Sequence, residues 1–408
     1  MKKIIWYVSK YANTQKYGAN TRQSSFCKEF AKNGYEVKLI TSNSSHLYPN
    51  LPQFNERYLE EENDNYDVVW VNILKYSNPS SIRRIAGWLL FEFYVMSLPF
   101  RKKFRKPDIV IASSLSLFSV LSGSFFKCFF KSQFIFEVRD IWPQSLVDLK
   151  GISIRHPLVI FMRMIEKFGY RYADQIVGTM PGLSMHVEGG AQKSDKVHFI
   201  PQGVDLKFYD IEQKEVTAQY VNSYLPEGKF IVTYAGTLGV ANALEYVIEA
   251  AKLIESENEN VHFVLMGTGA EKDNLMNQAQ GLSNVTFAPR VEKTQVQSIL
   301  SKSNVLIASV RGEPIYKYGI SLNKFIDYMY AKKPIVCMYS GVPSMINEAH
   351  CGEFVSAESP KEFADCLLRY ADKSESELSK MGESGHKFLV QERNFNVLSK
   401  QYMELFND

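Results

Sequence analysis

Short apolar runs alternate with longer helical patterns from one end of the chain to the other. Several runs are rich in Val and Ile and apolar on both faces, as buried strands of parallel sheets are. In the first half these runs are residues 4–8, 37–41, 68–71, 109–112, 134–138, 175–179 and 197–200. In the second half they are residues 230–234, 261–266, 285–288, 305–309, 335–338 and 353–356. The stretches between them are long enough for helices, so the pattern predicts repeated βαβ units.

The alternation is interrupted once, at Pro201-Gln202-Gly203-Val204-Asp205, and a polar stretch follows before it restarts near residue 229. We therefore predict an α/β fold with two Rossmann-like domains, whose parallel sheets face a central cleft. The predicted segments are an N-terminal domain (1–200), a linker (201–228) and a C-terminal domain (229–390). The remaining residues, 391–408, include an amphipathic pattern that predicts a terminal helix at about 396–406.

Composition supports a globular protein, since 45% of the 408 residues are hydrophobic and 22% are charged. The net charge of +3 conceals an asymmetry. Residues 1–200 carry 27 Lys and Arg against 17 Asp and Glu, whereas the remainder carries 20 against 27. A basic first half suggests that this half faces an anionic partner, either nucleic acid or a bilayer surface.

The five cysteines are few, odd in number and far apart, and none forms a C-x-x-C pair. This usage predicts reduced thiols and a cytoplasmic location. The basic and apolar N-terminus superficially resembles a signal peptide. However, the apolar run stops at Val8, and polar Ser9 and Lys10 follow, so we predict a first β-strand instead.

The stretch 88–100 is apolar and aromatic, and basic clusters flank it at 83–84 and 101–106. It is shorter than the roughly 20 apolar residues that span a bilayer, and Glu92 interrupts it. An aromatic stretch beside basic clusters suits a helix that lies in an anionic membrane interface. Residues 125–131 have the same character. The alternative is a buried crossover helix, and part of each stretch must be that. Nucleic-acid binding is less favoured, because we find no recognised module.

Ligands of open parallel sheets bind at the carboxyl ends of the strands, so the loops that follow strands are the candidate sites. After the first strand, Gly18 allows close backbone approach beside a helix start; an ordinary turn is the alternative. After the strand 134–138, Glu137, Arg139 and Asp140 gather beside Trp142. Either carboxylate could accept a proton from an attacking hydroxyl. The alternative is a structural charge cluster.

Two glycine-containing turns follow strands of the second half. Gly236 and Thr237 belong to the turn after the strand 230–234, and Gly267 to the turn after 261–266. Glycines there would let the backbone approach a phosphate or a sugar. Each turn is a weak signal when taken alone.

The segment 311–329, after the strand 305–309, carries the strongest signal of the chain. Ser321 could cap a helix that starts beside Gly319, and Lys324 in its first turn would grip a diphosphate. Asn323 and Asp327 lie four residues apart, hence on one face, and Asp327 could bind two ribose hydroxyls. Further cations that could assist are Lys317 and Arg311. The alternative is a capped helix with a solvated charged face.

The sequence lacks the usual marks of a metal site. It has no convincing D-x-D after a strand, and the seven histidines show no metal-ligand spacing. We therefore expect no metal and no other cofactor. The G-x-S-x-G and metalloprotease motifs are also absent from the sequence.

Together these motifs resemble the retaining, family-4 type of GT-B glycosyltransferases over essentially the whole length. Pro201-Gln202-Gly203-Val204-Asp205 is similar to that family's interdomain P-N-G-V-D, and the segment from Gly319 to Pro334 to its donor-binding helix. Asp327-Tyr328-Met329 matches the usual E-A-M, and Pro334 matches the proline of the usual A-x-G-x-P that follows it. The resemblance implies a GT-B fold whose terminal helix crosses back onto the first domain.

Within the family, the motifs at 137–143 and 319–324 are similar to those of bacterial capsule and O-antigen enzymes that add N-acetyl-L-fucosamine. The resemblance implies transfer with retention from a UDP-sugar to a polyprenyl-diphosphate-linked acceptor. It places the enzyme in the cytoplasm, peripheral on the inner face of the bacterial plasma membrane. A UDP-sugar 2-epimerase of the same fold and a non-catalytic sugar-nucleotide-binding module are the alternatives.

The chain departs from the family at several charged positions. The first of the family's two glutamates falls on Gly319, and the usual Arg and Lys after the first strand of the second domain fall on Thr237 and Asn242. Lys324, Lys317, Arg290 and Arg311 would have to replace those cations. The residues implied in catalysis are Lys324, Asp140 and Glu137. Those implied in donor binding are Gly18, Arg139, Gly236, Thr237, Gly267, Arg290, Lys317, Gly319, Ile320, Ser321, Asn323 and Asp327.

Overall fold

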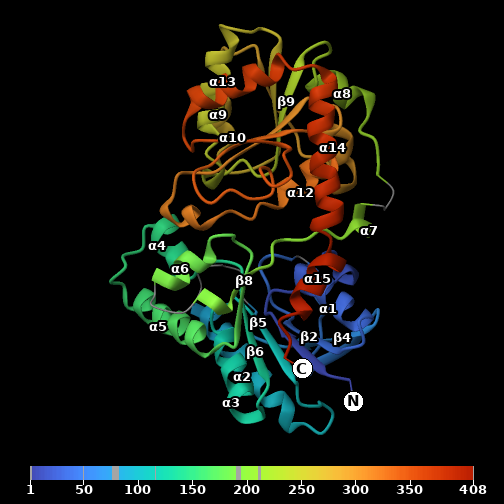
Figure 1. The fold of residues 1–408 in the computed structure, drawn as a ribbon, viewed down its shortest axis with the longest axis vertical. Helices are drawn as coiled ribbons and strands as arrows, with labels where there is room; N and C mark the ends of the chain where they lie inside the picture. Colours follow the sequence, from blue (N-terminus) through green and yellow to red (C-terminus); the bar gives the residue numbers. More distant parts are fainter. Residues whose placement is uncertain are drawn as a thin grey trace. The chain divides into compact units, whose positions relative to one another are not determined.

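The computed structural model describes residues 2–48, 50–75, 82–114, 116–189, 194–209 and 213–407. It divides into two compact units, each with its own sheet. The N-terminal unit comprises Met1–Gly203 and Phe395–Asp408, and the C-terminal unit comprises Val204–Asn394 (Figure 1).

The N-terminal unit is built on an eight-stranded sheet in the order β3-β4-β2-β1-β5-β6-β7-β8. Its strands are β1 (Ile4–Val8), β2 (Glu36–Ser42), β3 (Tyr58–Asn63), β4 (Tyr66–Val71), β5 (Ile109–Ser113), β6 (Gln133–Val138), β7 (Gln175–Gly178) and β8 (Val197–Phe199). All pairs are parallel except β3 with β4, which form an antiparallel hairpin at one edge.

Helices cover both faces of this sheet. They are α1 (Arg22–Lys32), α2 (Ile82–Ser97), α3 (Ser119–Phe130), α4 (Gln144–Lys150), α5 (Pro157–Tyr172), α6 (Leu183–Gly189) and α15 (Phe395–Met403), with short 3₁₀ turns η1 (Gln15–Tyr17), η2 (Leu98–Phe100) and η3 (Ser194–Lys196). Side chains of β1 alternate between the two faces. Ile5 and Tyr7 share a core with α1 and α15, whereas Trp6 shares one with α2 and α3. Because both faces are covered, the strands are apolar throughout.

The terminal helix α15 is part of the N-terminal unit. Phe395, Tyr402 and Phe406 pack edge-on against Phe26 and Phe30 of α1. Figure 1 shows α15 beside α1, with the C-terminus close to the N-terminus. Residues from the two ends of the sequence therefore complete one hydrophobic core.

The C-terminal unit contains a six-stranded, fully parallel sheet in the order β11-β10-β9-β12-β13-β14. The strands are β9 (Phe230–Ala235), β10 (Val261–Met266), β11 (Val285–Ala288), β12 (Val305–Ser309), β13 (Ile335–Met338) and β14 (Gly352–Val355). The order reverses between β9 and β12, which is the point of a doubly wound sheet where ligands bind.

Its helices are α7 (Leu206–Tyr209), α8 (Ala218–Tyr224), α9 (Glu245–Glu255), α10 (Lys272–Gln278), α11 (Val296–Leu300), α12 (Asn323–Tyr330), α13 (Pro360–Ala371) and α14 (Glu375–Glu392), with 3₁₀ turns η4 (Val240–Asn242), η5 (Lys293–Gln295) and η6 (Pro314–Tyr318). Helices α9, α10 and α13 share one core with the sheet. Helices α12 and α14 share a core on the other face. The predicted linker region, 201–228, contains α7 and α8.

The prediction of two Rossmann-like α/β domains is confirmed. Every run predicted as a strand forms one, with bounds within two residues of those expected. The sequence did not predict β3, whose residues Tyr-Leu-Glu-Glu-Glu-Asn lack an apolar alternation because this edge strand is largely half-buried. Among the described residues, no helix is long and apolar enough to cross a membrane.

Candidate functional site

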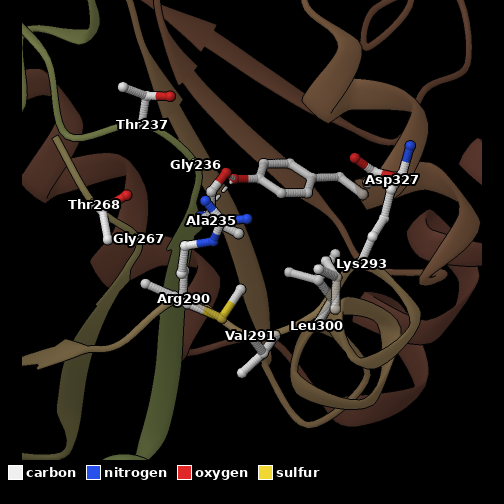
Figure 2. Close-up of a pocket in the computed structure, with 13 residues that line it drawn as sticks. Ala235, Gly236, Thr237, Gly267, Thr268, Arg290, Val291, Lys293, Leu300 and Asp327 are labelled. Atoms are coloured by element: carbon white, nitrogen blue, oxygen red, sulfur yellow. Dashed lines mark hydrogen bonds between the residues drawn. The ribbon is translucent and has the colours of Figure 1, made fainter. Parts of the chain in front are cut away.

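A cavity of about 330 Å³ opens at the carboxyl ends of β9 and β10 in the C-terminal unit. Thr237 and Thr268 lie toward one end of it, and Lys293 and Asp327 toward the other (Figure 2). Apolar side chains form part of its wall, among them Met266, Val291, Val296 and Leu300. The cavity therefore offers an apolar surface between polar ends, as small-molecule sites commonly do.

Close approach of two backbone turns shapes one wall of the cavity. A Cβ on Gly267 would lie 1.8 Å from the carbonyl oxygen of Gly236, and one on Gly269 would lie 2.0 Å from that of Leu238. Gly267 also has a φ of +155°, which L side chains rarely adopt. Only glycine fits these positions, and both predicted turns, at Gly236 and at Gly267, line the cavity.

Helix α12 is held against the ends of two strands by Tyr328. The Tyr328 hydroxyl accepts a hydrogen bond from the Ala235 N–H at 2.9 Å and donates to the Ile307 carbonyl at 3.1 Å. Phe325 and Met329 are buried in the core beneath the helix. This anchoring fixes where the polar residues of the first turn lie.

Lys324 lies beside the turn that follows β9. Its Nζ donates to the Tyr234 hydroxyl at 3.0 Å and to Asn242 Oδ1 at 3.2 Å, and lies 4.1 Å from the centre of the Tyr234 ring. The Nζ would lie 3.5 Å from a Cβ on Gly236, so the ammonium is next to the cavity wall. Burial lowers the pKa of Lys324 to about 8, because a half-enclosed ammonium loses hydration.

Asp327 lies one turn further along α12 and lines the cavity. Its Oδ1 accepts a hydrogen bond from the Tyr209 hydroxyl at 2.6 Å. Burial raises the pKa of this carboxyl, and the bond to Tyr209 and the charge of Lys293 oppose the rise. Tyr209 is itself held by a ring contact with Tyr330 at 4.3 Å. The carboxylate is thus oriented within the cavity.

The expected capping of α12 by Ser321 was wrong. The helix begins at Asn323 with Leu322 as its N-cap residue, and a leucine side chain has no hydrogen-bond acceptor. Gly319 ends η6 with a φ of +113°, and Ile320 is buried in the core. Ile320 therefore serves packing, while Asn323 is exposed at the start of the helix.

The other cations expected to assist have different surroundings. Arg311 forms an ion pair with Glu245 and also donates to the Val240 carbonyl, so its charge is neutralised within the unit. Lys317 is exposed on η6 over the ring of Tyr318. Arg290 lines the cavity, as the sequence predicted, and Lys293 joins it there.

In the N-terminal unit, Glu137 lies in the interior and not at an accessible edge. Its carboxylate accepts hydrogen bonds from Tyr7 Oη at 2.7 Å, Ser113 Oγ at 2.9 Å and Arg22 Nε at 2.9 Å. The side chains of Glu137 and Arg22 are both fully buried. Although burial alone would raise the pKa of Glu137, the Arg22 guanidinium and the other donors hold it below its usual value. Glu137 is a structural carboxylate, and its expected contact with an acceptor is corrected accordingly.

The neighbouring residues of that loop remain accessible. Asp140 is exposed and Arg139 is half-buried, with its backbone N–H donating to Ser114 Oγ at 3.0 Å. Gly18 is exposed at the end of η1 with a φ of +87°. The structure thus brings five predicted residues to the cavity: Gly236, Thr237, Gly267, Arg290 and Asp327.

Sequence reasoning missed the residues that position these groups. Tyr209 precedes the cavity elements by more than twenty residues, and Tyr234 reads as the buried end of a strand. Thr268, within the predicted turn at Gly267, and Lys293 also line the cavity, but neither was predicted as a site residue. Position 242 carried a sequence signal for one of these contacts. The family resemblance expects a lysine there, and Asn242, which takes its place, accepts a hydrogen bond from Lys324.

Residues 229–373 match the protein-family model described as Glycosyl transferases group 1. The chain is 24% identical over 233 residues to the alpha-D-kanosaminyltransferase of Streptomyces kanamyceticus, covering 54% of this chain and 59% of that protein. It is 26% identical over 304 residues to WcaI of Escherichia coli K12, named for glycosyl transfer in colanic acid biosynthesis, covering 69% of this chain and 70% of WcaI. The chain therefore spans under two thirds of the first relative's length.

An E. coli structure described as trehalose-6-phosphate bound with UDP-2-fluoro glucose matches with a TM-score of 0.72. The match covers 100% of this chain and 99% of that chain at 11% identity, which shows the fold. The chain has the GT-B fold, and its residues 229–373 match the model of the glycosyl transferases group 1 family.

Proposed function

We propose that this protein is a glycosyltransferase that moves a sugar from a UDP-sugar to a lipid-linked saccharide in capsule or O-antigen synthesis. The observation that carries the proposal is the pairing of Lys324 and Asp327 on the first two turns of α12. The lysine lies against the Gly236 turn, and the carboxylate lines the cavity at the same sheet edge.

Lys324 takes the diphosphate in this proposal. Negative charge develops on the leaving diphosphate as the sugar departs, and a fixed cation stabilises that charge without reorganising. Lys324 Nζ contacts Asn242, which stands where the resembling family has a lysine. A cation from α12 therefore replaces the one missing from the loop after β9. Arg290 and the N–H groups at the start of α12 add to the positive potential.

Asp327 binds the ribose hydroxyls, since an oriented carboxylate can accept a hydrogen bond from each of the two hydroxyl groups of a diol. The apolar wall formed by Met266, Val291 and Leu300 covers the faces of the base. We propose UDP as the carrier, supported by the UDP-2-fluoro glucose named for the matching E. coli structure. We propose N-acetyl-L-fucosamine, or a related N-acetylated sugar, as the group transferred with retention of configuration.

The acceptor side is assigned to the N-terminal unit. Asp140, exposed after β6, would orient the attacking hydroxyl, with Arg139 beside it. The acceptor is a polyprenyl-diphosphate-linked saccharide, so the enzyme would act at the cytoplasmic face of the membrane. Cationic side chains supply the charge stabilisation that a metal ion would otherwise give, so the proposed reaction is metal-independent.

Titration of the protein with UDP tests the proposal at the nucleotide site. We expect Asp327→Asn to weaken UDP binding roughly tenfold to a hundredfold, because a charged hydrogen bond contributes about 1.5–3 kcal/mol. Arg311→Lys is the matched control, since Arg311 is already paired with Glu245. Equal binding of UDP by wild type and Asp327→Asn would overturn the assignment of the ribose site.

Product analysis separates the proposed transfer from its two rivals. Release of UDP that requires the lipid-linked acceptor supports a transferase. Conversion of the UDP-sugar to an epimer without any acceptor supports a UDP-sugar 2-epimerase. Binding of UDP with no turnover in either assay supports a non-catalytic module, and would contradict the transferase.

A further inference from the structure

A second cavity, of about 540 Å³, lies in the N-terminal unit, at the edge of its sheet where β1 and β5 begin. Among the described residues, six cationic side chains line it: Lys2, Lys3, Arg101, Lys102, Arg105 and Lys106. Asp108 contributes the one carboxylate, and its Oδ2 is engaged by the Ile4 N–H at 2.8 Å. Six like charges around one hollow repel each other, so the cavity is built to attract an anion.

Two of these cations have hydrogen-bond partners within the protein, one of them a carboxylate. Arg105 pairs with Glu36 at 2.6 Å, and Lys3 donates to the Asn407 carbonyl. Lys106 lies 4.9 Å from the centre of the Phe130 ring, and Arg101 4.5 Å from that of Tyr58. Aromatic rings hold these cations in place without cancelling their charge. The cavity therefore retains a net positive charge.

An apolar face adjoins the cavity. Phe100, between the cavity-lining Pro99 and Arg101, is 73% exposed, and its ring lies 6.1 Å from that of Phe130 on α3. On the outer sides of α2 and α3, Phe93 is 62% and Phe129 71% exposed. Such large exposed aromatic side chains gathered together mark an interaction surface.

Helix α5 extends this face, although its sequence was not among the apolar stretches first singled out. It packs against α3, where Gly169 faces Val120 and the Tyr172 carbonyl accepts from Lys127 at 2.8 Å. The side chains that it leaves exposed form a stripe along the helix: Ile160, Phe161, Met164, Phe168 and Tyr172. Helices α2, α3 and α5 therefore present one apolar layer on the side away from the sheet.

The charged side chains on and around the apolar layer indicate the kind of partner that it binds. The acidic residues within α2 and α5 are Glu92 and Glu166, both buried, and α3 has none. The exposed charged side chains of these three helices are basic, among them Lys167 and Arg171 on α5. An apolar layer with a cationic border fits an anionic bilayer, where rings enter the interface and cations meet phosphates.

We propose that the basic cavity binds the phosphate headgroup of an anionic phospholipid while the outer layer of α2, α3 and α5 lies in the bilayer interface. This inference deepens the proposed function, from which it takes a lipid-linked acceptor. The headgroup would hold the N-terminal unit at the surface of the membrane that carries the lipid-linked acceptor.

Flotation with phosphatidylcholine vesicles, with and without phosphatidylglycerol, tests the proposal on the full chain. We expect partition onto the anionic vesicles, reduced about tenfold or more by Lys102→Glu with Lys106→Glu. The matched control is Lys361→Glu with Lys380→Glu, which changes the net charge equally on exposed positions of the C-terminal unit. An equal loss in both pairs would show a general charge effect and overturn the cavity assignment.

The apolar layer has its own matched pair. Met164→Ser with Phe168→Ser should weaken vesicle binding, whereas Leu253→Ser with Met276→Ser, comparably exposed in the other unit, should not. Unchanged flotation of the α5 pair, or equal binding of wild type to neutral vesicles, would overturn the proposal. Binding of inorganic phosphate by a protein that does not bind vesicles would show a site for free phosphate and would also overturn the proposal.

Nucleotide binding in solution keeps the two proposals distinguishable. The Lys102→Glu, Lys106→Glu variant should bind UDP as the wild type does, because the cavity lies in the N-terminal unit. Vesicle binding by a wild type that does not bind UDP would contradict the proposed function and leave the membrane site standing.

Discussion

Lys324 illustrates how one residue acquires its chemistry from its surroundings. An ordinary lysine stays protonated far above neutral pH, whereas enclosure beside Tyr234 lowers the pKa of Lys324 to about 8. The proposed site therefore has a cation whose charge changes within the range in which enzymes are assayed.

Titration of Lys324 should set the pH dependence of UDP binding. Because a diphosphate binds the protonated amine, affinity should be constant below the pKa and fall about tenfold per pH unit above it. Lys324→Arg stays protonated and should lose this fall, even if its altered geometry weakens binding at every pH. Calorimetric titration with UDP from neutral to alkaline pH measures both proteins. A wild-type affinity that stays level above pH 8 would count against the assignment.

Glu137 and Asp140 belong to one loop yet should respond differently to substitution. Glu137→Gln leaves the buried Arg22 charge unpaired and should destabilise the N-terminal unit by about 3–5 kcal/mol. Asp140→Asn changes an exposed side chain and should alter stability by less than about 0.5 kcal/mol while lowering turnover. Denaturant unfolding and a transfer assay distinguish them. Full stability in Glu137→Gln would contradict a structural role.

At the scale of elements, the ends of β9 and β10 are shaped by backbone contact more than by side chains. The turns after these strands touch at Gly236 and Gly267, where a methyl group on Gly267 would overlap the Gly236 carbonyl. Such turns let main-chain N–H groups approach a ligand.

Substitutions of two glycines in these turns should separate this backbone contact from general flexibility. Gly267→Ala places a Cβ against the Gly236 carbonyl at a φ of +155° and should destabilise the C-terminal unit by about 1–3 kcal/mol. Gly239→Ala, in the turn after β9, meets its nearest side-chain atom at 3.6 Å with a φ of −134° and should be nearly neutral. Thermal unfolding with and without UDP measures both effects. Equal stabilities would argue against the close approach.

At the scale of the whole molecule, chain order and structural unit do not coincide. Helix α14 ends in the C-terminal unit, and α15 begins three residues later in the N-terminal unit. The two units have separate cores, so a change in one core should be felt mainly by its own unit.

Helix α15 allows this separation to be measured. Leu398 is fully buried in the core with Phe26 and Tyr402, and Leu398→Ala should destabilise the N-terminal unit by about 2–5 kcal/mol. Leu389→Ala, equally buried on α14, is the matched change in the C-terminal unit. Calorimetry should show UDP raising the melting temperature of the unit that Leu389→Ala weakens. Stabilisation by UDP of the unit that Leu398→Ala weakens would contradict the location of the nucleotide site.

The sequence by itself determined the two Rossmann-like units, nearly all their strands and the glycines that line the cavity of the C-terminal unit. Runs of Val and Ile are apolar on both faces because parallel strands are covered on both faces, so local pattern and burial agree. The antiparallel strand β3 was not predicted, because an edge strand is only partly buried and its residues need not form an apolar run.

Only the tertiary structure decided which charged residues serve the site. Glu137 and Asp140 are three positions apart, yet one points into the core to meet Arg22 and the other to solvent. Arg311 and Lys324 are both cations of the same segment. Glu245 neutralises Arg311, whereas Lys324 donates a hydrogen bond to the uncharged Asn242. Partners that arrive from distant parts of the chain set charge, pKa and access. A local sequence pattern does not contain them.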